Sequence, residues 1–331
     1  MMNQCKPKAL ICGVGGQDGA YLAKFLLDKG YKVWGTSRDA QMSAFSKLRA
    51  LGVLEQVELL SMAPTDFRSV LTAISRSDPD EIYFLAAQSS VGLSFEQPVD
   101  TIESITLGTL NVLEAMRFLK SKARLYNASS SECFGDLGRE AATERTPFRP
   151  CSPYAVAKAS AYWLVCNYRE AYELYACNGI LFNHESPLRP ERFVTRKIIS
   201  AACRIYHGSS EKLVLGRLDI ERDWGWAPDY VSAMWRMLQQ ESSDDFIVAT
   251  GRSYRLEQFV EKSFSKFFLN WQDHVIIDES LFRPNELAWS QGDASKAKRL
   301  LGWEAKYDMN DVVDLMIEAE MIDIEQRSAV N

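Results

Sequence analysis

The first half of the chain alternates short β-type runs with helical patterns, and this alternation constrains the fold more than any other feature. The helical segments carry apolar residues at three-to-four spacing, as helices that cover both faces of a parallel sheet do. We therefore predict a doubly wound α/β sheet that binds its ligands at the carboxyl ends of its strands. The predicted strands are residues 9–12, 32–35, 57–60, 81–85 and 124–128, and the predicted helices are residues 21–29, 45–51, 67–75 and 101–119.

The alternation breaks beyond residue 183 into mixed helices, short strands and polar loops. We expect one large domain over residues 1–183 and a smaller mixed α/β domain over residues 184–331. A β-type run at residues 244–249 could return to the first sheet. Part of residues 215–250 is therefore expected to belong to the first domain, so that the two domains interleave.

Charge and composition exclude several classes of protein. A net charge of -6 and a pI near 5.4 argue against a nucleic-acid partner, because phosphate binding needs a basic face. Seven scattered cysteines without a CxxC pair favour a reduced, cytoplasmic chain. No apolar run approaches the roughly 20 residues that cross a bilayer, so no membrane partner is predicted. The three histidines are far apart, so we expect no metal site.

A glycine-rich loop follows the first predicted strand and opens a helix. Gly13, Gly16 and Gly19 permit a tight turn, close approach of the backbone to a pyrophosphate, and close contact of helix and strand. The motif alone is weak, but its place between a strand and an amphipathic helix strengthens it. The loop therefore predicts a dinucleotide cofactor.

The second strand ends at Arg38, where an NAD enzyme usually presents an acidic residue to the ribose hydroxyls. A guanidinium suits a 2'-phosphate, so we predict NADP, although Asp39 keeps NAD open. The fourth strand closes on Leu85, Ala86, Ala87 and Gln88. Small residues are expected where the backbone passes near a cofactor; an ordinary strand end is the alternative.

Four side chains suited to proton transfer fall within one compact span of chain. Tyr154 and Lys158 lie four residues apart on a helix that begins near Pro153, so the ammonium can lower the phenol pKa from about 10 toward neutrality. Ser130 and Glu132 follow the fifth strand. Beside a dinucleotide, such a tyrosine removes the proton of an alcohol that is being oxidised. Glu132 is an additional group that plain alcohol oxidation does not require. For the Tyr154–Lys158 spacing, the alternative interpretation is an ordinary helix with an exposed amine.

Longer segments carry more specific information than the glycine loop. The most specific are Asn-His-Glu-Ser-Pro at residues 183–187 and Arg-Asp-Trp-Gly at residues 222–225. With residues 16–23, 85–89, 131–132, 152–158, 167–170, 193–197, 282–284 and 301–303, they cover nearly the whole chain. Over these segments the chain resembles the extended short-chain dehydrogenase/reductase family, and within it the GDP-mannose 4,6-dehydratases.

This resemblance implies a Rossmann-type NADP-binding domain, a substrate-binding domain and a redox-neutral elimination from a GDP-sugar. Tyr154 would take the C4 hydroxyl proton while hydride moves from C4 to NADP, and Ser130 would hydrogen-bond the C4 oxygen. Glu132 would remove the acidified C5 proton, water would leave from C6, and the hydride would return to C6. The implied product is GDP-4-keto-6-deoxymannose.

The resemblance also assigns binding residues. Arg222 and Arg283 would clamp the diphosphate, and Glu286 would accept hydrogen bonds from guanine. The implied cofactor contacts, besides the glycines, Arg38 and residues 85–88, are Gln17, Asp18, Tyr154, Lys158, His184 and Arg189. The implied substrate contacts are Ser89, Ser130, Glu132, Asn183, Lys197, Gly216, Arg222, Arg283 and Glu286.

Departures from the family pattern leave alternatives open. Pro190 and Arg192 replace smaller residues near the sugar, so a GDP-mannoheptose 4,6-dehydratase stays possible, as does a GDP-sugar 4-epimerase or 4-keto reductase on the same scaffold. A non-catalytic NADP sensor is the alternative from another class. Residues 39–43 are a shortened form of a segment that links subunits in many relatives, so a homodimer and a homotetramer are both expected. Ala63 and Pro64 stand where relatives contact adenine, and Ser130 replaces a threonine.

Overall fold

A computed structural model describes residues 6–330, and its central feature is a parallel sheet of seven strands. The strands lie in the order β11 (Phe246–Val248), β6 (Ala176–Leu181), β5 (Arg124–Ser130), β4 (Glu81–Phe84), β1 (Lys8–Cys12), β2 (Lys32–Ser37) and β3 (Val57–Ser61). The order runs outward from β1 in both directions, which creates a switch point between β1 and β4. The predicted α/β class and the doubly wound Rossmann-type sheet are confirmed.

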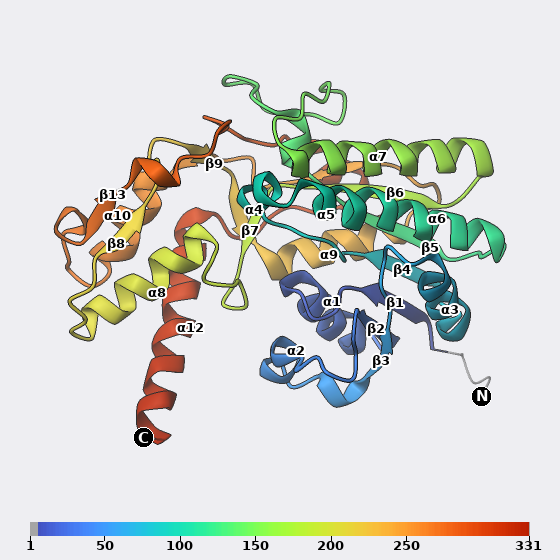
Figure 1. Cartoon of the computed structure of the whole chain (residues 1–331), viewed down its shortest axis with the longest axis horizontal. Coiled ribbons are helices and arrows are strands. Elements are labelled where there is room, and N and C mark those ends of the chain that lie inside the picture. The colour runs from blue at the N-terminus through green and yellow to red at the C-terminus, as the bar shows by residue number, and fades with distance from the viewer. Residues whose placement is uncertain (1–5, 331) are drawn as a thin grey trace.

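Helices cover both faces of this sheet (Figure 1). On one face lie α1 (Gln17–Asp28) and α9 (Ala227–Leu238); on the other lie α3 (Phe67–Ser77), α6 (Gly108–Phe118) and α7 (Pro153–Tyr172). Alternate residues of β1 belong to the two hydrophobic clusters that lie on opposite faces of the sheet. Ala9 and Ile11 belong to the cluster beneath α1 and α9, whereas Leu10 and Cys12 belong to the cluster beneath α3 and α6.

The helix predicted over residues 101–119 is present but interrupted. It runs as α5 (Pro98–Ile102), a wider π-type turn over Glu103–Leu107, and then α6. A Cβ at Gly108 would come 3.1 Å from Pro64 and 3.2 Å from Phe84, so the small residue lets α6 approach the sheet. Two shorter helices, α2 (Ser46–Ala50) and α4 (Val91–Glu96), flank the carboxyl edge of the sheet.

The second half forms its own core around α8 (Val194–Tyr206), α10 (Leu256–Ser265) and α12 (Met309–Val330). Three short strand pairs accompany it in the described residues: β7 (Asn183–Glu185) with β10 (Trp224–Trp226), β9 (Glu221–Arg222) with β12 (Tyr254–Arg255), and β8 (Leu213–Leu215) with β13 (Val275–Ile277). Within residues 6–330, no helix has the length and apolar character that a membrane span requires.

The two halves of the sequence interleave in space. The β-type run predicted to return to the sheet does so as β11, which pairs in parallel with β6. The helices α9 and α11 (Ser295–Leu301) also pack against the first domain. The boundary near residue 184 and the limits 215–250 stay predictions.

Candidate active site

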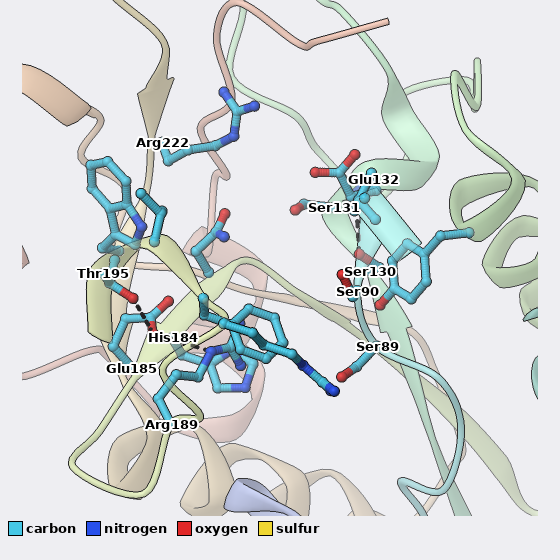
Figure 2. Close-up of a pocket in the computed structure, with 18 of the residues that line it drawn as sticks. Ser89, Ser90, Ser130, Ser131, Glu132, His184, Glu185, Arg189, Thr195 and Arg222 are labelled. Atoms are coloured by element: carbon cyan, nitrogen blue, oxygen red, sulfur yellow. Dashed lines mark hydrogen bonds and ion pairs between the residues drawn. The ribbon is translucent and has the colours of Figure 1, made fainter. Parts of the chain in front are cut away.

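A cleft of about 430 Å³ opens at the carboxyl ends of β4, β5 and β6, between the sheet and the second domain. Figure 2 shows one wall formed by Ser89, Ser90, Ser130, Ser131 and Glu132. The facing wall carries His184, Glu185, Arg189 and Thr195, and Arg222 stands toward one end. This is the position at which doubly wound sheets bind ligands.

The glycine loop has no room for side chains at Gly13 and Gly19. Gly13 has a φ of 91°, and a Cβ there would come 2.9 Å from the backbone of Ala86. A Cβ at Gly19 would come 2.4 Å from the carbonyl oxygen of Gly13. Gly16 precedes the first residue of α1, and the positive end of the helix dipole therefore faces the mouth of this cradle. The tight backbone cradle fits a dinucleotide pyrophosphate.

A buried ion pair ties the start of α1 to β7. The Asp18 carboxylate lies 2.9 Å from Nε2 of His184, whose Nδ1 donates to the carbonyl oxygen of Phe182 at 2.7 Å. Burial, the largest single cause, opposes ionisation of both groups, but the charge attraction and hydrogen bond between them, with weaker contributions from their neighbours, together outweigh it. The pKa of Asp18 is therefore lowered to about 2 and that of His184 is raised. Gln17 is also buried and donates to Asp18 and to the carbonyl oxygen of His184. The Gln17 amide thus holds the loop against β7.

The end of β5 and the start of α7 bring together Ser130, Glu132 and Tyr154. Ser130 ends β5, and its hydroxyl accepts the backbone N–H of Glu132 at 3.3 Å. Ser152 caps α7 by accepting from the N–H of Ala155 at 3.1 Å, which fixes Tyr154 in the first turn. Burial raises the pKa of Glu132, with Arg222 and Arg283 opposing.

The expected effect of Lys158 on Tyr154 is not found, and this corrects the sequence-based prediction. Burial raises the pKa of Tyr154, and the opposing hydrogen bond comes from Ser130 rather than from the lysine. The Lys158 ammonium donates instead to the carbonyl oxygen of Ala128 at 2.7 Å and lies 5.8 Å from the Tyr154 ring centroid. Burial lowers the pKa of Lys158 to about 8. In this structure, desolvation of the phenol outweighs the ammonium.

A charged cluster closes the other end of the cleft. Oε1 of Glu286 accepts from Arg222 at 2.8 Å and from Arg283 at 3.2 Å. The Arg222 side chain is only 6% exposed, whereas that of Arg283 is 38% exposed. Lys197 also lines the cleft, and its ammonium donates to the carbonyl oxygen of Val214 at 2.6 Å. Cations thus gather where an anionic ligand could enter.

The cleft unites most of the predicted site residues. The nine predicted substrate contacts all line it: Ser89, Ser130, Glu132, Asn183, Lys197, Gly216, Arg222, Arg283 and Glu286. So do six of the predicted cofactor contacts: Asp18, Leu85, Tyr154, Lys158, His184 and Arg189. The glycines, Gln17, Arg38, Ala86, Ala87 and Gln88 lie outside this lining. Gln88 points its amide at Ser90 and Thr101.

Sequence reasoning missed the side chains that orient Arg189. Its guanidinium lies 3.2 Å from Glu185 and 3.7 Å from the Phe193 ring centroid, and Thr195 donates to Glu185 at 2.7 Å. Glu185 falls inside the specific segment at residues 183–187 and Thr195 inside the family-like segment at residues 193–197, which was the available signal. Across residues 6–330, no group of three His, Cys, Asp or Glu side chains is placed to hold a metal ion.

Known proteins resemble the chain at the level of sequence. A family model described as GDP-mannose 4,6 dehydratase matches residues 10–316. "GDP-mannose 4,6 dehydratase 1" of Arabidopsis thaliana is 46% identical, and the alignment covers 96% of this chain and 91% of that relative. "GDP-mannose 4,6-dehydratase" of Vibrio cholerae is 42% identical, with 98% of this chain and 96% of that relative covered.

Solved structures share the fold at lower sequence identity. A dTDP-glucose 4,6-dehydratase from Bacillus anthracis in complex with NAD superposes with a TM-score of 0.83 at 20% identity, covering 96% of this chain and 98% of that one. RMD from Pseudomonas aeruginosa, complexed with NADPH, gives a TM-score of 0.78 at 19% identity and the same coverage. At these identities the likeness shows a shared overall fold.

Proposed function

The chain belongs to the GDP-mannose 4,6-dehydratase family, and on that premise we propose that it converts GDP-mannose to GDP-4-keto-6-deoxymannose with a tightly held NADP. One observation carries the proposal: a single cleft holds Ser130, Glu132 and Tyr154 at one side and the Arg222–Glu286 pair at the other. The first set suits proton transfer on a sugar, and the second suits a guanosine diphosphate. The relatives' names favour this reaction over the epimerase, reductase and heptose alternatives.

Each proton transfer has a candidate group in the cleft. When bound, NADP would take hydride from C4 of the hexose and return it to C6. Tyr154 accepts the proton of the C4 hydroxyl, and Ser130 hydrogen-bonds the same oxygen. Burial of Tyr154 makes its phenolate costly, so proton acceptance needs a neighbouring positive charge, which the Lys158 ammonium, 5.8 Å from the ring centroid, can supply.

Glu132 is suited to both halves of the elimination. A ketone at C4 acidifies the C5–H, which a carboxylate can remove. Burial raises the pKa of Glu132, so the carboxyl can keep the proton gained from C5 and pass it to the departing C6 hydroxyl. Return of the hydride to C6 is then completed by uptake of one proton at C5. The neighbouring Arg222 and Arg283 keep the ionised form accessible.

The charged end of the cleft would bind the nucleotide. Arg222 and Arg283 present guanidinium groups that suit a diphosphate, and Lys197 adds a further cation. Glu286 can accept from the two N–H groups on the Watson–Crick edge of guanine. Its bonds to the two arginines use Oε1, which leaves Oε2 for the base.

NADP is proposed over NAD because of the two residues that follow β2. Asp39 accepts from the backbone N–H groups of Gln41 and Met42, both at 3.0 Å, so its carboxylate is engaged by its own loop. Arg38 is exposed beside it. We expect Arg38→Ala to weaken NADP binding about tenfold while leaving NAD binding unchanged, as measured by calorimetry.

We propose a cytoplasmic homodimer or homotetramer whose partner is a GDP-sugar, without nucleic-acid or membrane partners. Large apolar side chains are exposed together on α5, α6 and α7, among them Val99, Ile102, Phe118, Val156 and Trp163. Such a face on one layer of helices supports association with a second copy.

The decisive experiment uses GDP-mannose deuterated at C4, with no added NADP. Mass spectrometry should show loss of one water and deuterium at C6 of the product. Consumption of added NADPH in stoichiometric amounts would indicate a 4-keto reductase instead. A parallel incubation with GDP-mannoheptose tests the alternative sugar, and dehydration of that sugar alone would overturn the proposed substrate.

A further inference from the structure

The loop between β7 and α8 carries a second arginine, Arg192, besides Arg189. Arg192 lines the cleft, is exposed, and has no carboxylate partner in the part of the chain that the structure describes. Its guanidinium carbon lies 5.2 Å from the Phe193 ring centroid, on the ring that Arg189 also contacts. Phe193 therefore acts as a platform that holds two arginines at one wall of the cleft.

The surroundings place this wall beside the glycine loop. Arg189 and Arg192 both interact electrostatically with Lys47, which in turn interacts with Asp18 at the start of α1. Lys47 belongs to α2, which packs beside α1 (Figure 1). The ring of Phe45, just before α2, comes within 3.7 Å of the position that a Cβ on Gly15 would occupy. Lys47, on α2, and the two arginines, on the loop after β7, thus interact electrostatically near Asp18 at the start of α1.

The charges in this region do not balance. His184 and Arg189 are matched by Asp18 and Glu185, respectively. Lys47 and Arg192 add two further cations. Burial lowers the pKa of Lys47, and Asp18 opposes this shift. The two arginines lower the pKa further, as expected for a cation that lies near other cations. A doubly anionic ligand at this position would relieve the repulsion.

Resting on the proposed function, we propose that Arg192, assisted by Lys47, contacts the pyrophosphate of the bound dinucleotide and slows its release. Lys47 comes from α2 and Arg192 from the loop after β7, and Arg192 lines the same cleft as Asp18, the second residue of α1. A cofactor that must return its hydride to the same sugar has to remain bound throughout the cycle. Attraction between the cations Arg192 and Lys47 and the pyrophosphate would keep the dinucleotide bound without adding contacts to its nicotinamide.

The test compares NAD and NADP, because a pyrophosphate contact is common to both. Arg192→Ala should weaken the binding of both dinucleotides by the same factor, about tenfold, and raise their release rates accordingly. Arg192→Lys should recover part of the loss, and Lys47→Met should show a smaller effect. Binding is measured by calorimetry and release by stopped-flow fluorescence of NADPH. The affinity of wild-type protein should also fall more steeply with salt than that of Arg192→Ala.

Controls separate this proposal from its competitors. Arg145→Ala removes an exposed arginine outside the cleft and should leave dinucleotide binding unchanged. If Arg192→Ala weakens GDP-mannose binding and spares NAD and NADP, Arg192 contacts the substrate and the proposal is wrong. A loss confined to NADP would assign Arg192 to the 2'-phosphate and also overturn it. These readouts need no turnover, so failure of the dehydratase reaction would be recognised separately.

Discussion

At the scale of single residues, the site depends on burial more than on proximity of charges. Tyr154, Lys158 and Glu132 all have pKa values shifted toward their neutral forms, and burial is the largest cause in each. Burial thus favours the neutral carboxyl of Glu132 and the neutral amine of Lys158, whereas at Tyr154 it disfavours the phenolate that proton acceptance requires. The same burial of ionisable groups lowers the stability of the folded protein, so a mutation can reduce activity without reducing stability.

Glu132→Gln should abolish most of the activity while preserving the fold. The neutral amide cannot take the C5 proton, so kcat should fall about 10²–10³-fold, with NADP binding unchanged. A carboxyl whose folded pKa is raised loses stability as pH rises above its unfolded value, so the amide should leave the melting temperature at pH 7 equal or higher. Turnover and calorimetric melting test the two halves. Full activity in this variant would remove Glu132 from the mechanism.

Asp18→Asn should destabilise the protein in a defined pH window. The Asp18 pKa near 2 gives a contribution that is present above about pH 4, while the raised His184 pKa gives one that is complete below about pH 6.5 and lost at higher pH. The loss in free energy of unfolding should therefore be largest between these values, at about 2 kcal/mol. Denaturant titrations at several pH values measure it.

The matched control for that prediction is Asp28→Asn on the same helix. Asp28 forms an exposed pair with Lys24 at 3.3 Å. Such surface pairs contribute little. An equal, pH-independent loss in both variants would contradict the role assigned to the buried pair.

At the scale of secondary-structure elements, the glycine loop joins β1 to α1. Its glycines differ in how much room the surrounding atoms leave for a side chain. A Cβ at Gly19 would meet backbone atoms of residues 13 and 14, whereas one at Gly15 would make an ordinary 3.7 Å contact with the Phe45 ring. Backbone atoms cannot move aside as a flexible side chain can. A side chain is therefore excluded at Gly19 but accommodated at Gly15. The loop is rigid where the helix meets the strand.

Gly19→Ala and Gly15→Ala therefore form a matched pair. The first should lower the free energy of unfolding by about 2 kcal/mol and weaken dinucleotide binding at least tenfold, because α1 must move away from the cradle. The second should change stability by less than about 0.5 kcal/mol. Thermal melting and calorimetric binding distinguish them, and similar effects from both substitutions would show that the cradle is not constrained in this way.

At the scale of the whole molecule, one layer of helices presents apolar side chains that the chain itself does not cover. Trp163 is 62% exposed and Phe118 is 67% exposed, on α7 and α6 respectively. Burial of such side chains against a second copy is favourable at roughly 25 cal/mol per Å². We therefore expect the proposed association between copies to depend on this layer and not on the second domain.

Trp163→Asp combined with Phe118→Asp should shift the assembly toward monomers. A charge introduced into an apolar interface must be desolvated, which costs several kcal/mol. Light scattering after size exclusion measures the mass. Phe268→Asp is the control, since Phe268 is exposed but follows α10 in the second domain. An unchanged mass in the double variant, or dissociation by the control, would place the interface elsewhere.

The sequence by itself determined the sheet, the glycine cradle and the candidate acid–base residues, because periodicity and glycine spacing are local properties of the chain. Only the tertiary structure decided which of these groups share surroundings. The placement of Lys158 against Ala128, the Asp18–His184 pair and the approach of Lys47 to Arg192 join segments far apart in sequence. The pKa of Tyr154 was predicted in the wrong direction for the same reason: desolvation depends on everything that surrounds a group, and no spacing along the chain reports it.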